Sequence, residues 1–182
     1  VVPVKSGQSV GAYHLERKLG EGGMAEVFLG IHERLGRPAA VKIVKGGQRE
    51  EIQQRFEREA RLLASLSHTD IAAVYEIGSV EDGRPYYAME YFDGEPLDRI
   101  VARDGPMEEG LACEVLFRLC GILQYACDRG VLHRDVKPEN LLLSVDAQGA
   151  PALKLIDFGL AKALDPAEHD QLTREVSLLG TL

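Results

Sequence analysis

Two short polar strings, separated by two apolar runs, constrain this chain more than any other feature. The first string, at residues 133–140, reads His-Arg-Asp-Val-Lys-Pro-Glu-Asn, and the second is the Asp-Phe-Gly tripeptide at 157–159. The apolar runs 141–143 and 153–156 between them read as two short buried strands. Such a pair of strands would bring Asp135, Asn140 and Asp157 together. One carboxylate that orients a hydroxyl, with oxygen ligands for magnesium beside it, is what phosphoryl transfer requires.

Composition narrows the classes of protein that need to be considered. The chain has 182 residues, a net charge of −8 and a pI of about 5.2, which indicates one globular domain and makes a nucleic-acid binder a poor fit. Its longest apolar runs are far shorter than a membrane span, and no secretory signal opens it. Because the chain is poor in cysteine and carries an odd number of them, a cytoplasmic location is expected. Because the chain begins with Val1 rather than Met, we expect it to be a fragment of a longer protein.

The three cysteines are expected to be reduced, since the chain is poor in cysteine and their number is odd. Cys113, Cys120 and Cys127 are seven residues apart on one predicted helix, so they share a stripe. Neighbours in such a stripe lie roughly 10 Å apart, too far for a disulfide or a shared metal ion. We predict that they are small core residues.

The order of predicted elements divides the chain near residue 93. A sheet with one amphipathic helix is expected first, and a helical part after it. The strands are expected at 13–19, 26–31, 39–44, 71–77 and 85–92, and the helices at 49–66, 96–102 and 108–129. Asp82 and Gly83 read as a hairpin turn, and Gly130 as the stop of the last helix.

A glycine-rich turn joins the first two expected strands. Glycines at 20 and 22 would let the backbone approach phosphate groups closely, and the amides of the turn can donate to them. The signal is weak by itself, because glycine-rich hairpins are common and Ala25 stands where a third glycine is usual in such loops. The chain lacks a G-x-x-x-x-G-K-[ST] string, which excludes a P-loop NTPase.

Lys42 lies in an otherwise apolar expected strand and could simply be an edge residue that faces water. The following helix argues for another role. At about 100° per residue, Glu59 falls on the same stripe as Phe56 and Leu63, whereas Glu57 points to the far side. A carboxylate on an apolar stripe needs a partner. We therefore predict a Lys42–Glu59 ion pair.

Together these segments resemble the eukaryotic-type Ser/Thr protein kinases, and residues 22–27 and 89–94 are most similar to the bacterial branch of that family. The resemblance runs from about residue 13 to the end. It implies an α+β, two-lobe kinase fold, with a flank at 1–11, an antiparallel-sheet N-lobe at 12–93 and a partial helical C-lobe at 94–182. Lys137, two residues after Asp135, resembles the Ser/Thr class.

The resemblance also implies ATP, Mg²⁺ and protein substrates with Ser or Thr hydroxyls. Asp135, Lys137, Lys42 and Glu59 would be catalytic, and Asn140 and Asp157 would hold the metal. Met89 would be the gatekeeper, and the backbone of Glu90 and Phe92 would bind the adenine edge. The ATP site would comprise Leu19, Gly20, Glu21, Gly22, Gly23, Met24, Ala25, Glu26, Val27, Ala40, Lys42, Met89, Glu90, Phe92 and Leu142. A spine of Leu63, Val74, His133 and Phe158 would join the lobes.

Regulation follows from the same resemblance. Arg134 beside Asp135 suggests control by phosphorylation in the loop 160–179, where Thr173 and Ser177 are the candidate sites. The chain ends at residues 180–182, where the substrate-docking segment of the family would open. Apolar surface is therefore expected on residues 108–160. Residues 1–182 alone are expected to have little transferase activity. A dimer for autophosphorylation and a membrane anchor outside the stretch are compatible with the family.

The sequence is also compatible with two alternative functions. A pseudokinase that binds a nucleotide or a partner would have been indicated by loss of Lys42, Asp135 or Asp157, and all three are present. A small-molecule kinase of related fold is disfavoured by Lys137-Pro138-Glu139, which belongs to the protein-kinase pattern.

Overall fold

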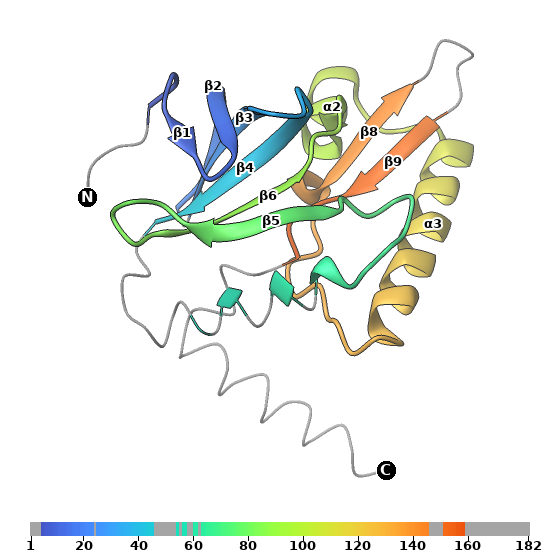
Figure 1. The fold of residues 1–182 in the computed structure, drawn as a ribbon. Helices are drawn as coiled ribbons and strands as arrows, with labels where there is room; N and C mark the ends of the chain where they lie inside the picture. Colours follow the sequence, from blue (N-terminus) through green and yellow to red (C-terminus); the bar gives the residue numbers. More distant parts are fainter. Residues whose placement is uncertain are drawn as a thin grey trace.

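The computed structural model describes residues 5–23, 25–45, 54, 56–57, 60–61, 63–145 and 151–158. Its first part is an antiparallel sheet of six strands in the order β1-β2-β3-β4-β6-β5 (Figure 1). The strands are β1 (Ser9–Val10), β2 (Tyr13–Glu21), β3 (Ala25–His32), β4 (Pro38–Val44), β5 (Val74–Ser79) and β6 (Pro85–Glu90).

The central strands explain why Lys42 is largely shielded from water. β4 lies between β3 and β6, and Lys42 is opposite Val27 on one side and Tyr87 on the other. Its neighbours Val41 and Ile43 are fully buried. Apolar residues on both faces suit a central strand, whereas an edge strand would leave one row of backbone groups unpaired. Lys42 is therefore not an edge residue facing water.

The second part contains two helices and a small sheet. The helices are α2 (Leu97–Asp104) and α3 (Glu109–Cys127), and the sheet has the order β7-β8-β9. Its strands are β7 (Glu95–Pro96), β8 (Leu141–Val145) and β9 (Pro151–Leu155), with a 3₁₀ turn, η1 (Pro138–Asn140), just before β8. Figure 1 shows β8 and β9 between the six-stranded sheet and α3.

Leu155 joins the two parts through its backbone. Its amide donates to the carbonyl of Asp70 at 2.7 Å, and its carbonyl accepts from the amide of Ala72 at 3.0 Å. These bonds form a parallel bridge between Ile71 and Leu155. The Leu155 side chain is fully buried in the larger apolar core, which contains residues from both parts of the molecule. The segment before β5 is thereby tied to the strand that leads into Asp157.

Two further contacts hold this segment on α3. Arg118 of α3 binds both carboxylate oxygens of Asp70, at 2.6 and 3.0 Å, and also donates to the carbonyl of Pro151 at 3.1 Å. The Tyr125 hydroxyl donates to the carbonyl of Ser67 at 2.8 Å. A two-point arginine–carboxylate contact restricts orientation as well as distance. The position of the sheet relative to α3 is therefore set by side chains as well as by the apolar core.

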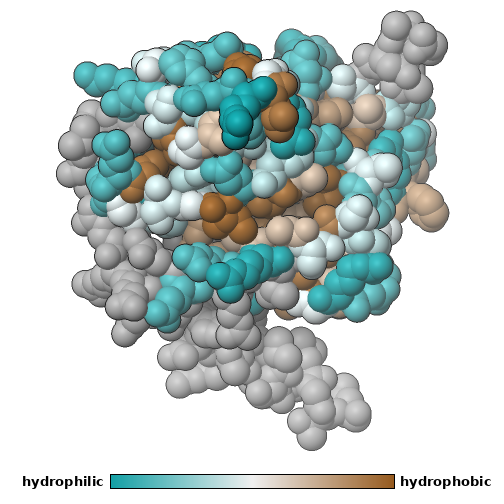
Figure 2. Space-filling view, viewed as in Figure 1, coloured by the Kyte–Doolittle hydropathy of each residue, from teal (hydrophilic) through white to brown (hydrophobic). Residues whose placement is uncertain are grey.

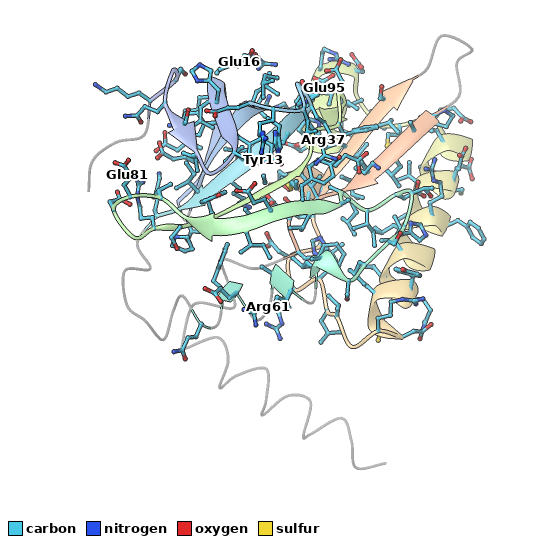
Figure 3. All side chains as sticks on the ribbon, viewed as in Figure 1. Tyr13, Glu16, Arg37, Arg61, Glu81 and Glu95 are labelled. Carbon is cyan, nitrogen blue, oxygen red and sulfur yellow. The ribbon has the colours of Figure 1, made fainter. Side chains whose placement is uncertain are left out.

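The described residues of the predicted helix at 49–66 are helical as far as residue 64, two residues short of the predicted end, and their burial follows the predicted stripe. Phe56, Ala60 and Leu63 are buried, whereas Glu57 is exposed. Glu57 pairs with Arg61 at 3.1 Å, and Arg61 points away from the sheet (Figure 3). The orientation predicted for Glu57 is confirmed. Glu59 lies outside the described residues, as does its predicted pairing with Lys42.

The prediction for the cysteines is wrong. All three are free, as predicted, but they are exposed rather than part of the core. The buried stripe of α3 is formed by Val115, Leu119, Ile122 and Ala126. At about 100° per residue, the cysteines lie roughly 110–150° around the helix from the centre of that stripe. Seven-residue spacing places residues on one face, but it does not say which face the rest of the protein covers.

The uncovered face of α3 is also apolar. Phe117 is 82 % exposed and Leu116 is 59 % exposed. Figure 2 shows hydrophobic atoms protruding at the edge of the molecule where α3 lies. The apolar surface predicted for this region is confirmed. By length and composition alone α3 could cross a membrane, with 22 % of its most apolar window buried, but core helices of soluble proteins can meet the same criterion.

Candidate active site

A cleft of about 340 Å³ opens between the six-stranded sheet and β8. Figure 2 shows hydrophobic side chains gathered in the middle of one face, bordered by hydrophilic ones. The volume lies in the range of small-molecule sites. Eight residues predicted for the ATP site line the cleft: Leu19, Gly20, Val27, Ala40, Met89, Glu90, Phe92 and Leu142. Arg17, Tyr91, Gly94, Pro96, Arg99 and Ile156 also line it and were not predicted.

The back edge of the cleft, where β6 ends, is braced by a buried lysine. Lys154 of β9 donates to Glu90 Oε1 at 2.8 Å and to the carbonyl of Thr69 at 2.6 Å. The Glu90 amide in turn donates to the carbonyl of Ala73 at 2.8 Å. Lys154 is buried and the Glu90 side chain is 30 % exposed, so solvent reaches this ion pair only from the Glu90 side. Glu90, whose backbone is predicted to contact the adenine, is thus held by its side chain to β9 and by its backbone to the segment 69–73.

Surface charges brace the glycine-rich turn. The Gly22 amide donates to the carbonyl of Ala25 at 2.9 Å and closes the turn. Lys45 binds Glu21 at 2.6 Å and the carbonyl of Gly22 at 2.9 Å, while Lys18 also contacts Glu21. Hydrogen bonds from Lys18 and then Lys45 lower the pKa of Glu21 to about 2. These lysines were missed at the sequence level, because only the fold places them beside the turn.

The inner end of the site is built on Asp157. Lys42 Nζ lies 2.6 Å from Asp157 Oδ1, and the Tyr87 hydroxyl donates to the same oxygen at 2.9 Å. Asp157 has a φ of 58°, in the left-handed region that non-glycine residues seldom adopt. Burial, and then the negative charge of Asp157, raise the pKa of Tyr87 well above its ordinary value. The phenol therefore keeps its proton and acts as a donor.

The octet of residues 133–140 folds into a loop whose contacts converge on Asp135. Lys137 Nζ lies 3.1 Å from Asp135 Oδ2, and Asn140 Nδ2 donates to the same oxygen at 3.2 Å and to the Asp135 carbonyl at 2.8 Å. The Asn140 carbonyl accepts from the amide of Ile156 at 2.9 Å. Arg134 has a φ of 60°, a second left-handed residue in the site. The three predicted groups of the octet are thus brought together and tied to the chain that enters Asp157.

His133 is a packed residue, as the sequence analysis predicts. Its ring lies 4.6 Å from the ring of Phe158, and Nε2 donates to the carbonyl of Ile156 at 3.0 Å. Nδ1 accepts from the amide of Asp135 at 3.3 Å. One nitrogen that donates and one that accepts define the neutral ring. Leu63, Val74 and Phe158 line one cavity of about 10 Å³, and His133 packs on Phe158, so the four residues predicted for the spine lie close together.

Burial of His133 has a consequence for stability. Burial lowers the pKa of His133 below its ordinary value of 6.5, so the unfolded chain takes up a proton at a higher pH than the folded one. The free energy of unfolding should therefore be highest above pH 6.5 and fall as the pH is lowered through 6.5 toward the folded pKa. Urea unfolding between pH 5 and 8 measures this. His133→Phe should flatten the slope, and His14→Gln, at an exposed histidine, should not. Equal slopes for His133→Phe and the wild type would contradict the assignment.

The acceptor atoms present suit a magnesium ion held partly by phosphates. Among the described residues no three His, Cys, Asp or Glu side chains cluster as a metal site. Magnesium usually takes only one or two protein carboxylates and completes its shell with phosphate and water. Asp157 is 20 % exposed, with Oδ1 occupied by Lys42 and Tyr87, so Oδ2 is the oxygen that would bind. Asn140 uses its amide nitrogen in the loop, which makes its oxygen the second candidate ligand.

Several residues predicted for the site lie outside the described residues or away from the cleft. Met24, Glu59, Thr173 and Ser177 lie outside the described residues. Six other residues predicted for the ATP site are described but do not line the cleft: Glu21, Gly22, Gly23, Ala25, Glu26 and Lys42. Tyr87 and Lys154 were missed. The only signal for either was a polar group within an apolar strand pattern, and that pattern does not identify the partner.

Comparisons with known proteins agree with the geometry. The family model of the protein kinase domain matches residues 13–181. The serine/threonine-protein kinase PknB of Mycobacterium leprae is 39 % identical over 174 residues, which cover 93 % of this chain and 27 % of the relative. Pkn1 of Myxococcus xanthus is 37 % identical over 177 residues, 96 % of this chain and 25 % of the relative.

Solved structures show the same fold. The crystal structure of the Mycobacterium tuberculosis PknI kinase domain aligns with a TM-score of 0.73 at 31 % identity, over 87 % of this chain and 64 % of that one. The chain therefore spans about a quarter of the length of these curated relatives and about two thirds of a solved kinase domain. The predicted kinase fold is confirmed, and the chain belongs to the protein kinase family.

Proposed function

We propose that the protein of which this chain forms part is a serine/threonine protein kinase that transfers the γ-phosphate of ATP to protein hydroxyls. One observation carries the proposal. The ion pair of Lys42 with Asp157 lies at one end of the path Asp157–Ile156–Asn140–Asp135, so the groups predicted to bind phosphate, to bind metal and to act as the base lie along one chain of contacts. The names of the relatives support the Ser/Thr class.

Each group has a role that its position allows. The apolar cleft would hold the adenine ring, and Lys42 would position the α- and β-phosphates with Glu59 as its predicted partner. Asp157 and Asn140 would hold Mg²⁺, which supplies charge neutralisation on the phosphates when bound. Asp135 would orient the substrate hydroxyl and accept its proton late, beside Lys137, which would steady the γ-phosphate. Positioning and electrostatics then account for most of the rate.

The location of the protein, its partners and its phosphorylation sites are part of the same proposal. We infer a cytoplasmic kinase domain that acts on protein. Its net charge of −8 argues against binding to nucleic acid. Thr173 and Ser177 remain candidate phosphosites, and autophosphorylation between two copies remains a proposal. A pseudokinase is disfavoured because Lys42, Asp135 and Asp157 are all present and lie along one connected path.

Nucleotide binding is the first test. Calorimetric titration of the protein at its natural length with ATP and MgCl₂ should give saturable binding that is weakened strongly by Lys42→Met and loses its magnesium dependence in Asp157→Asn. Lys5→Met, at an exposed lysine, is the matched control and should bind normally. Absence of magnesium-dependent binding in the wild type would contradict the proposal.

The acceptor class is tested separately. Transfer of labelled γ-phosphate should occur to a generic basic protein and not to free small-molecule alcohols. The reverse preference would favour a small-molecule kinase, and binding without transfer to either would favour a pseudokinase.

A further inference from the structure

Tyr87 places a hydroxyl in an otherwise apolar region behind the cleft. The residue lies in β6, is 2 % exposed and belongs to the larger apolar core together with Phe56 and Met89. Its ring centroid is 5.9 Å from that of Phe56. The one polar atom of the side chain reaches Asp157 Oδ1 at 2.9 Å, across 70 residues of sequence. A buried hydroxyl is costly unless it is hydrogen-bonded, and Asp157 is the partner that satisfies this one.

Asp157 Oδ1 has two donors of different mobility. Lys42 has a flexible side chain, and the proposed function requires its ammonium group to contact nucleotide phosphates. Tyr87 is rigid once its ring is packed, because only two side-chain torsions place the hydroxyl. If Lys42 turned toward the phosphates, as that function requires, the phenol would remain as the donor on Oδ1. Asp157 also has a left-handed backbone, which costs conformational energy and needs support from its surroundings.

We propose that Tyr87 is a positioning residue for the metal-binding carboxylate. Its hydroxyl holds Asp157 Oδ1 and so directs Oδ2 toward Mg²⁺. This inference rests on the proposed function, because it assigns Tyr87 a part in the metal site of that function. It predicts that the phenol contributes to the affinity for the metal and not to the affinity for the nucleotide itself.

The neighbouring residue offers a matched control. Tyr86 is also buried in β6, and its hydroxyl also donates to a carboxylate, that of Glu76 in β5. It belongs to the second apolar core, on the other face of the sheet, together with Phe28 and Val41. Tyr86→Phe therefore removes the same atom from the same strand in a similar environment, but away from Asp157.

The experiment measures magnesium affinity directly, with ADP as the probe so that no transfer takes place. MgCl₂ is titrated into the ADP-bound protein at its natural length, and ADP binding is also measured in EDTA. Tyr87→Phe should weaken magnesium binding by about tenfold, the order expected for one hydrogen bond to a charged group. ADP binding in EDTA should be unchanged. Tyr86→Phe should alter neither quantity, and Tyr87→Phe should have no further effect on magnesium binding when Asp157→Asn is already present.

The results separate this inference from the proposed function. If the wild type does not bind ADP with magnesium, the proposed function fails. If it does, and Tyr87→Phe binds magnesium as the wild type does, only the role of Tyr87 is overturned. Equal weakening of ADP binding with and without magnesium would show a general packing role instead. Tighter magnesium binding in Tyr87→Phe would show that the phenol competes with the metal, which also overturns the inference.

Discussion

Asp135→Asn is expected to lower the rate of phosphate transfer by about 10²–10⁴-fold, the range for loss of a general base, while nucleotide binding is retained. The reason lies in the loop geometry. Asp135 Oδ2 is held by Lys137 at 3.1 Å and Asn140 at 3.2 Å, so the carboxylate is fixed for a substrate hydroxyl. An asparagine side chain has the same shape and can still accept one hydrogen bond, but it cannot take up the proton. The loop should therefore keep its structure, while the variant loses the group that accepts the proton.

The measurement is the initial rate of γ-phosphate transfer to a basic protein, with calorimetric ATP binding on the same samples. Glu139→Gln is the matched control, because Glu139 lies in the same loop and is exposed. It should retain the wild-type rate. If Asp135→Asn kept most of its activity, Asp135 would not be the base.

Leu155→Ala is expected to lower the free energy of unfolding by about 2–5 kcal/mol, the range for removing a large buried side chain. Leu155 is fully buried, and its backbone is bonded to Asp70 and Ala72. The substitution leaves a cavity at the junction between the two parts of the molecule. The strand is held there by two backbone bonds, so it has little freedom to move inward and fill the space. The cost should fall in the upper half of that range.

Urea unfolding at pH 7.5 measures this change as a shift of the midpoint. Leu35→Ala is the control, because Leu35 is 68 % exposed and its loss should change stability by no more than about 0.5 kcal/mol. Equal midpoints for the two variants would show that the junction is not a stabilising contact. An accompanying change in the slope of the transition would indicate that the two parts unfold separately.

Much of the fold could be predicted because its signals are local. The strands, the turn at Asp82-Gly83 and the stop at Gly130 follow from alternation, glycine and helical period within short windows. Glu57 was correctly assigned to the far side of its helix for the same reason. The short strands β1 and β7 were missed, since two residues carry no periodicity.

The cysteines show what local sequence patterns cannot predict. Helical period placed Cys113, Cys120 and Cys127 on one stripe, but α3 is apolar on more than one face. A periodic pattern identifies the core face only when the opposite face is polar. Which apolar face is covered depends on what lies against the helix, and this is a property of the assembled chain.

By itself the sequence determined which chemical groups the protein carries and in what order. The order of Lys42, Asp135, Asn140 and Asp157, with their apolar surroundings, was enough to indicate the family. This is because each motif is contained within a few consecutive residues and can be recognised without the fold. The tertiary structure alone decided which side chains meet across long separations. Tyr87 reaches Asp157, and Lys154 reaches Glu90, through strand pairings that no local pattern specifies. The physical reason is that burial makes a hydrogen-bond partner necessary, whereas only the packed fold determines which partner is within reach.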